Sequence, residues 1–298
     1  MFSGQGAQYA GMGKELYDKY DVCKDVFKLA DDALGWPVSE LCFEGGEDIN
    51  KTEFTQPAIL AVSMAMAALL EDKPCKPEFM LGLSLGEYTA LVASGALNFA
   101  EALPLVQKRG RFMTEACKEG EGVMSAVLNL SKKEVEEICR EASAVGLVSP
   151  ANYNAPGQIV IAGQVKAVEH AEQLAKAKGA KRCIRLQVSG AFHTELLKPA
   201  VQKLSDELEK VRISPIKTPV VSNLTARPIQ SSEQIIPTLL SQLTSSVLWE
   251  DSILYCIEQG IDTFIEIGPG KTLCSFVKKI NRTARAYTIE DILGGEVF

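Results

Sequence analysis

Short apolar runs of strand length alternate with helical segments along most of this chain, and no other feature limits its fold more. Residues 79–81, 218–223 and 263–267 are such runs, and each ends in a turn or loop that leads into a helical pattern. Strands joined through helices pair in parallel, because the helix carries the chain back to the end of the sheet where the previous strand began. The sequence therefore predicts an α/β fold with a mostly parallel sheet.

Residues 122–188 follow a different order. Two helical segments here separate four apolar runs, so the order is strand, helix, strand, strand, helix, strand. This order is typical of the ferredoxin-like split βαβ unit. We expect a small ferredoxin-like domain at 119–188, inserted into a larger α/β domain formed by 1–118 and 189–298. The strands are predicted at 123–128, 145–152, 158–162 and 182–188, and the helices at 131–144 and 165–178.

Charge and hydropathy exclude two classes of protein. The net charge is −7, whereas a nucleic-acid-binding protein usually carries a basic excess. The longest apolar stretch runs from Pro57 to Leu70 and is shorter than the roughly 20 residues of a membrane-spanning helix. We therefore expect neither a nucleic-acid partner nor a membrane span, and we interpret this stretch as a buried helix.

The cysteines are scattered along the chain, and none of them forms a C-x-x-C pair. With only two histidines present, this spacing favours neither a metal site nor a disulfide framework. Free cysteines are typical of a reducing compartment, so we expect the cytoplasm or an organelle matrix. The eight cysteines are Cys23, Cys42, Cys75, Cys117, Cys139, Cys183, Cys256 and Cys274.

A G-x-S-x-G motif at residues 82–86 lies between a predicted strand and a helix predicted at 85–94. Such a turn is sharp and strained, so the flanking glycines leave room for the strand and helix and present Ser84 as a nucleophile. The helix directs its positive end at the serine, and the backbone N–H of Leu85 can face an oxyanion. The alternative is a glycine-rich turn with an inert serine.

A nucleophilic serine needs a base, and the chain has two histidines. His170 lies in a charged helical segment, where we expect a solvated surface residue. His193 stands at the return to the larger domain, just before a predicted helix, and is the candidate base. The spacing does not indicate which third group would orient its imidazole.

Three further features are candidates for ligand contacts. Arg109, on a helix predicted at 99–118, could clamp a substrate carboxylate or form a surface ion pair. Gly4–Gln8 is a glycine-rich loop that could approach a ligand or form a plain turn. The segment from Gly270 to Arg285 has no acidic residue and could dock an acidic partner or form a solvated helix face. Its basic residues are Lys271, Lys278, Lys279, Arg282 and Arg285.

Together these motifs resemble the malonyl-CoA:acyl carrier protein transacylases, which are acyltransferases of fatty acid synthesis. The matching segments occur in the order of the family and cover nearly the whole chain. They are Gly4–Gln8, Thr55–Ala58, Gly82–Tyr88, Arg109–Gly110, Asn152–Gln158, Ala191–His193 and Glu266–Gly270.

The resemblance implies an α/β-hydrolase-like large domain and assigns roles to single residues. Ser84 would be the nucleophile and His193 its base, and Gln5 and the backbone N–H of Leu85 would form the oxyanion hole. Arg109 would pair with the malonyl carboxylate. The pocket would also include Gln56, Asn154, Phe192 and Gly268.

Three positions depart from the pattern of the family. Leu83 stands where the family usually has a histidine before the nucleophile. The family glutamine whose backbone carbonyl orients the base corresponds to Leu248. Family members begin with a full strand, whereas only two residues precede Ser3 here. Either this strand is short or part of it is missing from this chain, and we expect the second.

The expected reaction is ping-pong transfer of malonyl from malonyl-CoA, through malonyl-Ser84, to the phosphopantetheine thiol of acyl carrier protein. We expect a monomer that supplies fatty acid elongation and needs no metal or redox cofactor. The bulk of Phe192 favours malonyl over methylmalonyl. The alternatives are a serine esterase or thioesterase, a non-enzymatic subunit that docks a carrier protein, and an acyltransferase domain of a larger synthase.

Overall fold

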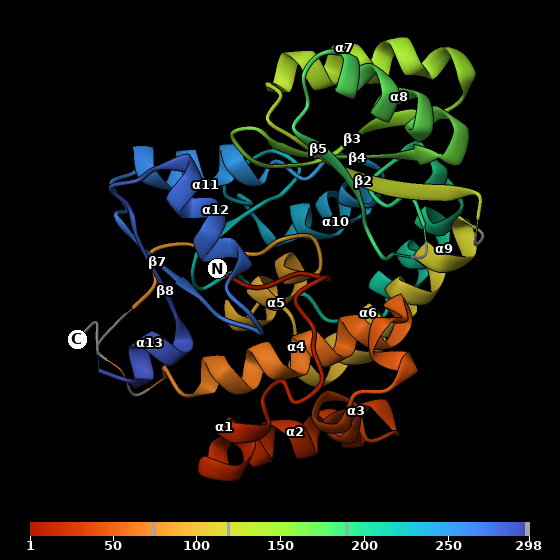
Figure 1. Cartoon of the computed structure of the whole chain (residues 1–298). Helices are drawn as coiled ribbons and strands as arrows, with labels where there is room; N and C mark the ends of the chain where they lie inside the picture. The colour runs from red at the N-terminus through yellow and green to blue at the C-terminus, as the bar shows by residue number, and fades with distance from the viewer. Residues whose placement is uncertain (72, 74–75, 118–119, 189, 296–298) are drawn as a thin grey trace.

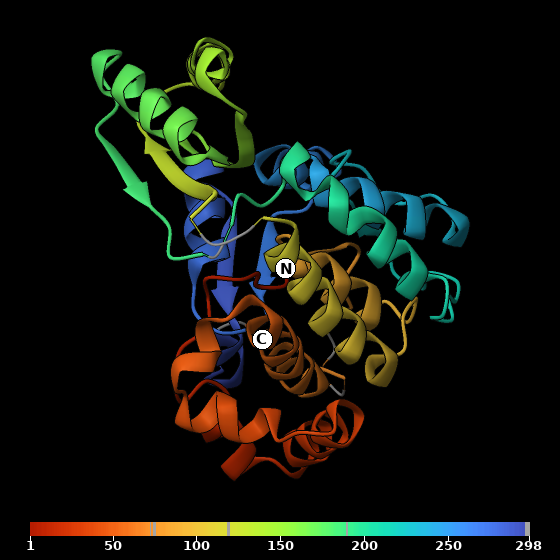
Figure 2. The same cartoon turned by 90° about the vertical axis from the view of Figure 1, so that its right-hand side faces the viewer.

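The computed structural model describes residues 1–71, 73, 76–117, 120–188 and 190–295. Figure 1 shows a larger body and a smaller unit above it, and Figure 2 shows that the smaller unit projects from one corner of the body. The predicted junctions at 118–119 and 189 lie outside the described residues, as does Cys75.

The sheet of the body consists of two parallel pairs. Strand β1 (Met80–Leu81) pairs with β6 (Val220–Val221), and β7 (Thr263–Glu266) pairs with β8 (Arg285–Thr288). Phe2 lies between the pairs, because it forms parallel bridges to both Gly82 and Ile267. The predicted α/β fold with parallel pairing is confirmed, although the strands are shorter than the apolar runs.

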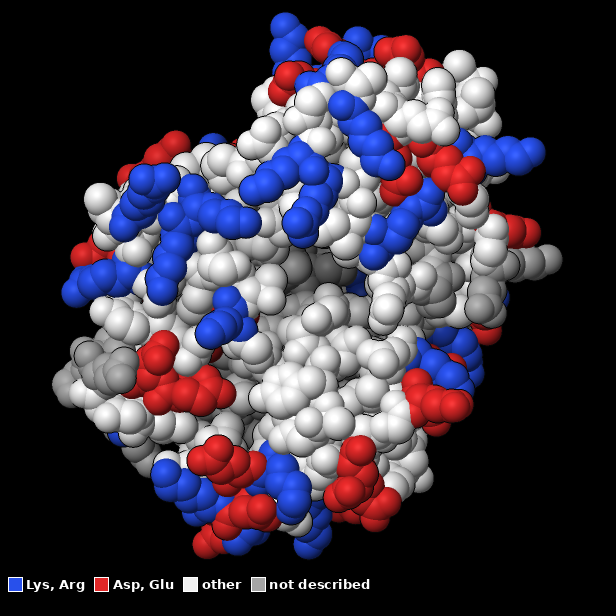
Figure 3. Space-filling view, viewed as in Figure 1, with Lys and Arg blue, Asp and Glu red and all other residues white. Residues whose placement is uncertain are grey.

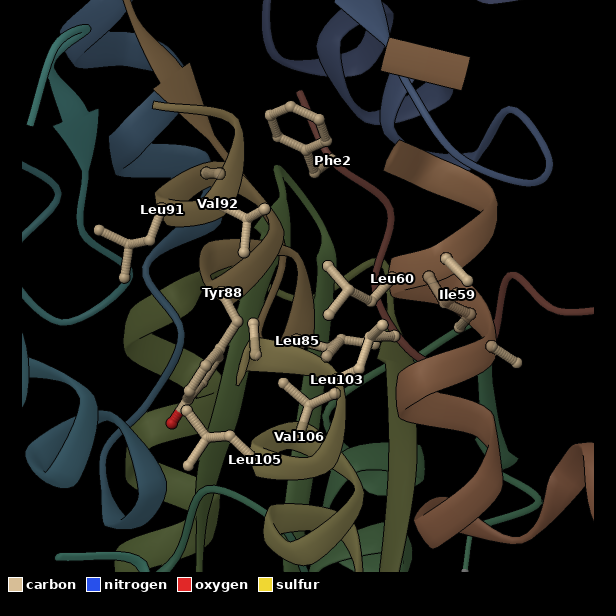
Figure 4. Packing of buried hydrophobic residues seen from close by; sticks show 14 of the residues in the cluster. Phe2, Ile59, Leu60, Leu85, Tyr88, Leu91, Val92, Leu103, Leu105 and Val106 are labelled. Carbon is tan, nitrogen blue, oxygen red and sulfur yellow. The ribbon is translucent and has the colours of Figure 1, made fainter. Parts of the chain in front are cut away.

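Three helices pack beside this sheet and form the centre of the core. They are α4 (Thr52–Ala68), α5 (Leu85–Ala93) and α6 (Phe99–Ala116). Figure 4 shows Leu60, Leu85 and Leu103, one from each helix, meeting in the space between them. The predicted buried helix at 57–70 is thus α4, and it starts five residues earlier than predicted.

The other helices of the body surround this centre. The predicted helix at 14–34 is broken at Tyr20, whose backbone is extended, and it ends at Gly35 (φ 73°) as predicted. The sequence did not predict α3, α12, β8 or α13 as separate elements. The helices are α1 (Lys14–Lys19), α2 (Asp21–Leu34), α3 (Val38–Glu44), α9 (Lys198–Leu208), α10 (Ile235–Thr244), α11 (Trp249–Glu258), α12 (Thr272–Ile280) and α13 (Ile289–Leu293).

The smaller unit contains the predicted order of strands and helices and has a hydrophobic cluster of its own. Its antiparallel sheet has the strand order β3-β4-β2-β5. The predicted capping box is present, since Ser131 and Glu134 bond to each other's backbone N–H groups. The elements are β2 (Gly122–Leu128), α7 (Lys132–Ala142), β3 (Val148–Ala155), β4 (Gln158–Gln164), α8 (Val165–Ala177) and β5 (Arg182–Arg185).

Candidate active site

Ser84 stands on the turn between β1 and α5 with φ 52° and ψ −101°, a backbone conformation that residues other than glycine rarely adopt. Both flanking glycines are required. A Cβ on Gly82 would lie 2.0 Å from backbone atoms of Gly86, and a Cβ on Gly86 would lie 2.2 Å from the carbonyl oxygen of Phe2. The turn is therefore as sharp as the motif predicts.

Asn223, which follows β6, holds this turn from the neighbouring strand. Its Oδ1 accepts a hydrogen bond from the Ser84 backbone N–H at 2.7 Å, and its Nδ2 donates to the Gly82 carbonyl at 2.7 Å. No motif in the sequence marks this residue. The available signal was its position, because a polar residue at the carboxyl end of a parallel strand lies beside the ends of the neighbouring strands.

The side chains of Ser84 and His193 meet although they are far apart in the sequence. Ser84 Oγ lies 2.7 Å from His193 Nε2, and His193 Nδ1 lies 2.9 Å from the backbone carbonyl oxygen of Gln242. Because a carbonyl can only accept, Nδ1 carries the ring proton and Nε2 is left to accept the serine proton. This is the tautomer that a general base requires.

The carbonyl that orients His193 belongs to Gln242 on α10, so the prediction that Leu248 supplies it is wrong. The Leu248 carbonyl instead accepts from the backbone N–H and the hydroxyl of Ser252 in the first turn of α11. The sequence could not show this, because the turn between α10 and α11 gives no signal for which carbonyl faces the ring.

Burial controls the charge of His193. Desolvation, and then the positive charge of Arg109, lower the pKa of His193 to about 4. The imidazole is therefore neutral near pH 7 and able to accept a proton.

Arg109 of α6 lies beside the serine, and only 1% of its surface is exposed. It donates to Gln56 Oε1 at 2.8 Å, to Gln242 Oε1 at 3.0 Å and to Ser84 Oγ at 3.2 Å. Its guanidinium stacks over the ring of Tyr88 at 5.0 Å. Within the described part of the chain it forms no ion pair, and its buried Nε has no acceptor. The arrangement leaves a buried positive charge beside Ser84 without a direct ion-pair partner, although the Glu87 carboxyl acts on it at longer range.

Glu87, also missed by the sequence analysis, is a buried carboxyl in the first turn of α5. Its Oε2 accepts from Gln242 Nε2 at 2.6 Å and from the backbone N–H of Asn223 at 3.2 Å. Burial raises the pKa of Glu87 to about 7, and these hydrogen bonds and the positive charge of Arg109 oppose the shift.

The loop that carries Gln5 packs against the serine turn, since a Cβ on Gly4 would lie 2.3 Å from the Leu83 carbonyl oxygen. The Gln5 side chain is directed elsewhere and donates to Thr52 Oγ1 at 3.0 Å. No described residue accepts a hydrogen bond from the backbone N–H of Gln5 or Leu85. Two backbone donors thus stay available around Ser84.

The remaining predicted residues differ in their relation to the site. Gln56 contacts Arg109, and Phe192 is buried next to His193 in the chain. Asn154 on β3 is buried, and its Oδ1 has no partner among the described residues. Gly268 lies against Ser3 and Ser63 rather than against the serine–histidine pair.

The comparisons with known proteins agree with this geometry. The model of the acyl transferase domain family matches residues 1–295. The malonyl CoA-acyl carrier protein transacylase of Bacillus subtilis is 45% identical, over 98% of this chain and 92% of its own. The crystal structure of a malonyl CoA-acyl carrier protein transacylase from Clostridium perfringens is 47% identical, has a TM-score of 0.94, and matches 99% of this chain and 95% of its own.

A third match is the structure of a type II polyketide synthase acyl-carrier protein in complex with its malonyl-transacylase. It is 38% identical, has a TM-score of 0.94, and covers 99% of this chain and 98% of the matched chain. These matches share the α/β fold and extend along nearly the whole sequence. This chain therefore belongs to the acyl transferase domain family, within the group of malonyl CoA-acyl carrier protein transacylases.

Proposed function

We propose that this chain transfers a malonyl group from malonyl-CoA to the phosphopantetheine thiol of an acyl carrier protein. The observation that carries the proposal is Arg109, a buried cation that donates to Ser84 Oγ and has no carboxylate partner among the described residues. An acyl group with its own carboxylate supplies the missing direct ion-pair partner. A neutral acyl group would leave the guanidinium without one, which a buried site disfavours.

In the first half-reaction Ser84 attacks the thioester carbonyl while His193 accepts its proton. The backbone N–H groups of Gln5 and Leu85 stabilise the tetrahedral oxyanion, and one such donor is typically worth about 2.7–4 kcal/mol. CoA leaves as a thiol after His193 returns the proton, and malonyl remains on Ser84. The carrier-protein thiol then attacks this ester with His193 as base again, so the chemistry requires neither a metal nor a redox cofactor.

The pocket discriminates among acyl groups through charge and bulk. Arg109 selects for a terminal carboxylate, with Gln56 and Asn154 contributing to the surroundings. The ring of Phe192 beside the base favours malonyl over methylmalonyl. A serine esterase has no use for a buried cation beside its nucleophile, and this observation disfavours that alternative.

The two parts of the chain fit an α/β-hydrolase-like domain, 1–118 and 189–298, with a ferredoxin-like insertion at 119–188. The order β3-β4-β2-β5 supports the second name, because it is the order expected of a split βαβ unit. The seven described cysteines are free, which supports a reducing compartment such as the cytoplasm. No described helix is both long and apolar enough to cross a bilayer. We further propose a monomer that supplies malonyl groups for fatty acid elongation.

The carrier protein docks, in this proposal, on the basic residues between the N-cap of α12 and the first residue of β8. Figure 3 shows Lys and Arg side chains gathered along the upper rim of a hollow on this face. Lys279 donates to Gln158 of β4 at 2.7 Å, so this docking surface reaches from the body to the smaller unit. Arg285 is partly neutralised by Asp262 at 2.8 Å. The surface consists of Lys271, Lys278, Lys279, Arg282 and Arg285, all exposed.

Intact-mass measurement after brief incubation with malonyl-CoA tests the function. We expect a malonyl adduct on the peptide containing Ser84, and no such adduct in the Ser84→Ala variant. The thiol of the carrier protein should remove this malonyl group faster than water does. Rapid loss to water alone would identify a hydrolase. A parent protein that forms no adduct, or an adduct that persists in Ser84→Ala, would refute the proposal.

A further inference from the structure

Glu87 has no task in the reaction described above, although it is fully buried beside the site. Its Oε2 accepts two hydrogen bonds, from the Gln242 amide and from the Asn223 backbone. Burying a carboxyl group is costly, as its raised pKa shows. A carboxyl retained at such a cost needs a function that an apolar residue could not fulfil.

The contacts of the Gln242 side chain indicate what this function is. Its Nε2 donates to Glu87 at 2.6 Å and to the Ser84 carbonyl at 3.1 Å, and its Oε1 accepts from Arg109 at 3.0 Å. If the amide turned over, its NH₂ group would face the Arg109 guanidinium and its oxygen would face the Glu87 carboxyl and the Ser84 carbonyl. Glu87 and the Ser84 carbonyl therefore favour the orientation that presents an acceptor to Arg109.

Arg109 depends on that acceptor for its position. Two amide oxygens hold its guanidinium, one from Gln242 and one from Gln56. The amide of Gln56 is less firmly fixed, because its Nε2 meets only the sulfur of Met113, at 3.5 Å. The Gln242 amide is thus the better anchored of the two supports.

We propose that Glu87 is a positioning residue that fixes the Gln242 amide and, through it, holds the Arg109 guanidinium ready for the acyl carboxylate. The inference rests on the proposed function, because the carboxylate in question is that of malonyl. It differs from a role in which Glu87 only stabilises the N-terminus of α5, where its charge is also favourable. A role limited to the helix would not change the choice between malonyl and acetyl.

The test compares kcat/KM for malonyl-CoA and acetyl-CoA in the parent, Glu87→Leu and Glu87→Gln. Glu87→Leu removes the acceptor at similar volume, whereas Glu87→Gln keeps an oxygen for the Gln242 amide. We expect Glu87→Leu to lower the malonyl-to-acetyl ratio about 10- to 100-fold, the loss typical of one buried hydrogen bond to a charged group. The loss should lie mainly in the KM for malonyl-CoA, and Glu87→Gln should restore the ratio to within about threefold of the parent.

Reaction of Ser84 with phenylmethanesulfonyl fluoride separates positioning of Arg109 from damage to the serine turn. This neutral reagent needs Ser84 and His193 but no cation, so Glu87→Leu should react at nearly the parental rate. Equal slowing of sulfonylation and malonylation would overturn the proposal, as would an unchanged malonyl-to-acetyl ratio.

Gln242→Met covers the case in which Glu87→Leu does not fold. This variant keeps the backbone carbonyl that orients His193 and removes only the amide. It should show the same loss of the malonyl-to-acetyl ratio, with no further loss when Glu87→Gln is added. A parental ratio in Gln242→Met would refute the positioning of Arg109 through the Gln242 amide. A parent that forms no malonyl-Ser84 would instead refute the proposed function and this inference with it.

Discussion

Replacing Arg109 with alanine should remove the preference for a malonyl group while leaving the serine reactive. Arg109 is 1% exposed and forms no direct ion pair with a described residue, so the incoming carboxylate becomes its ion-pair partner in a buried setting. Losing one partner of a buried pair costs about 3–5 kcal/mol. At about 1.36 kcal/mol per factor of ten, kcat/KM for malonyl-CoA should fall by roughly two to more than three orders of magnitude.

Transfer of acetyl should respond differently. Acetyl brings no charge to pair with Arg109, so the substitution removes an unfavourable buried cation from that complex. The nucleophile loses only its 3.2 Å hydrogen bond from Arg109 to Ser84 Oγ. We therefore expect acetyl transfer to change by less than about tenfold and to rise relative to malonyl transfer.

The assay measures transfer of labelled malonyl and acetyl from CoA to carrier protein over a range of substrate concentrations. Arg111→Ala is the matched control, because Arg111 lies on the same helix but is half exposed, pairs with Glu115 at 3.7 Å and stacks on the neighbouring Phe112 ring, away from Ser84. Thermal melting identifies any loss of fold, since Arg109→Ala also leaves the oxygens of Gln56 and Gln242 unpaired. A folded Arg109→Ala protein that keeps the parental malonyl-to-acetyl ratio would show that another group binds the carboxylate.

Two further predictions concern the base and the docking surface. Because burial lowers the pKa of His193 to about 4, kcat/KM for acylation should not show the half-loss at pH 6.5 expected of an ordinary imidazole, and should fall only as the pH approaches 4. The pKa of the Glu87 carboxyl is about 7, so the same pH profile measured in Glu87→Gln separates its titration from that of His193. A half-loss of kcat/KM near pH 6.5 in both proteins would contradict the low pKa of His193. Reversing the charge of the docking surface with Lys278→Glu and Arg282→Glu should raise the KM for carrier protein at least several-fold at low salt. Acylation by malonyl-CoA should stay unchanged. An unaffected KM would place the docking surface elsewhere.

The sequence was sufficient wherever a local pattern carries the physical requirement. The G-x-S-x-G turn needs both glycines for steric reasons, and His193 was the better candidate base of only two histidines. The strand and helix order of 122–188 followed from periodicity. These features are encoded within a few residues of where they act.

The sequence was insufficient wherever function depends on contacts between distant segments. Asn223 and Gln242 reach the serine turn from two other elements, and neither lies in a motif that marks it. Glu87 stands in the first turn of a helix, where an acidic residue is common, so nothing in the sequence separates a buried carboxyl from a solvated one. The error at Leu248 has the same origin, because only the folded chain shows which carbonyl faces the ring.

The bridges of Phe2 to both halves of the sheet have a consequence for how the enzyme matures. The serine turn rests on the Phe2 carbonyl, and the imidazole is oriented by Gln242, so the reactive pair requires segments from both halves of the chain. Contacts of such long sequence separation form late in folding. On the ribosome, Ser84 emerges long before Gln242 is made, so an incomplete chain carries an unactivated serine. Activity therefore arises only after Gln242 and Ile267 have been made, and during refolding it should return after most of the helical signal has recovered.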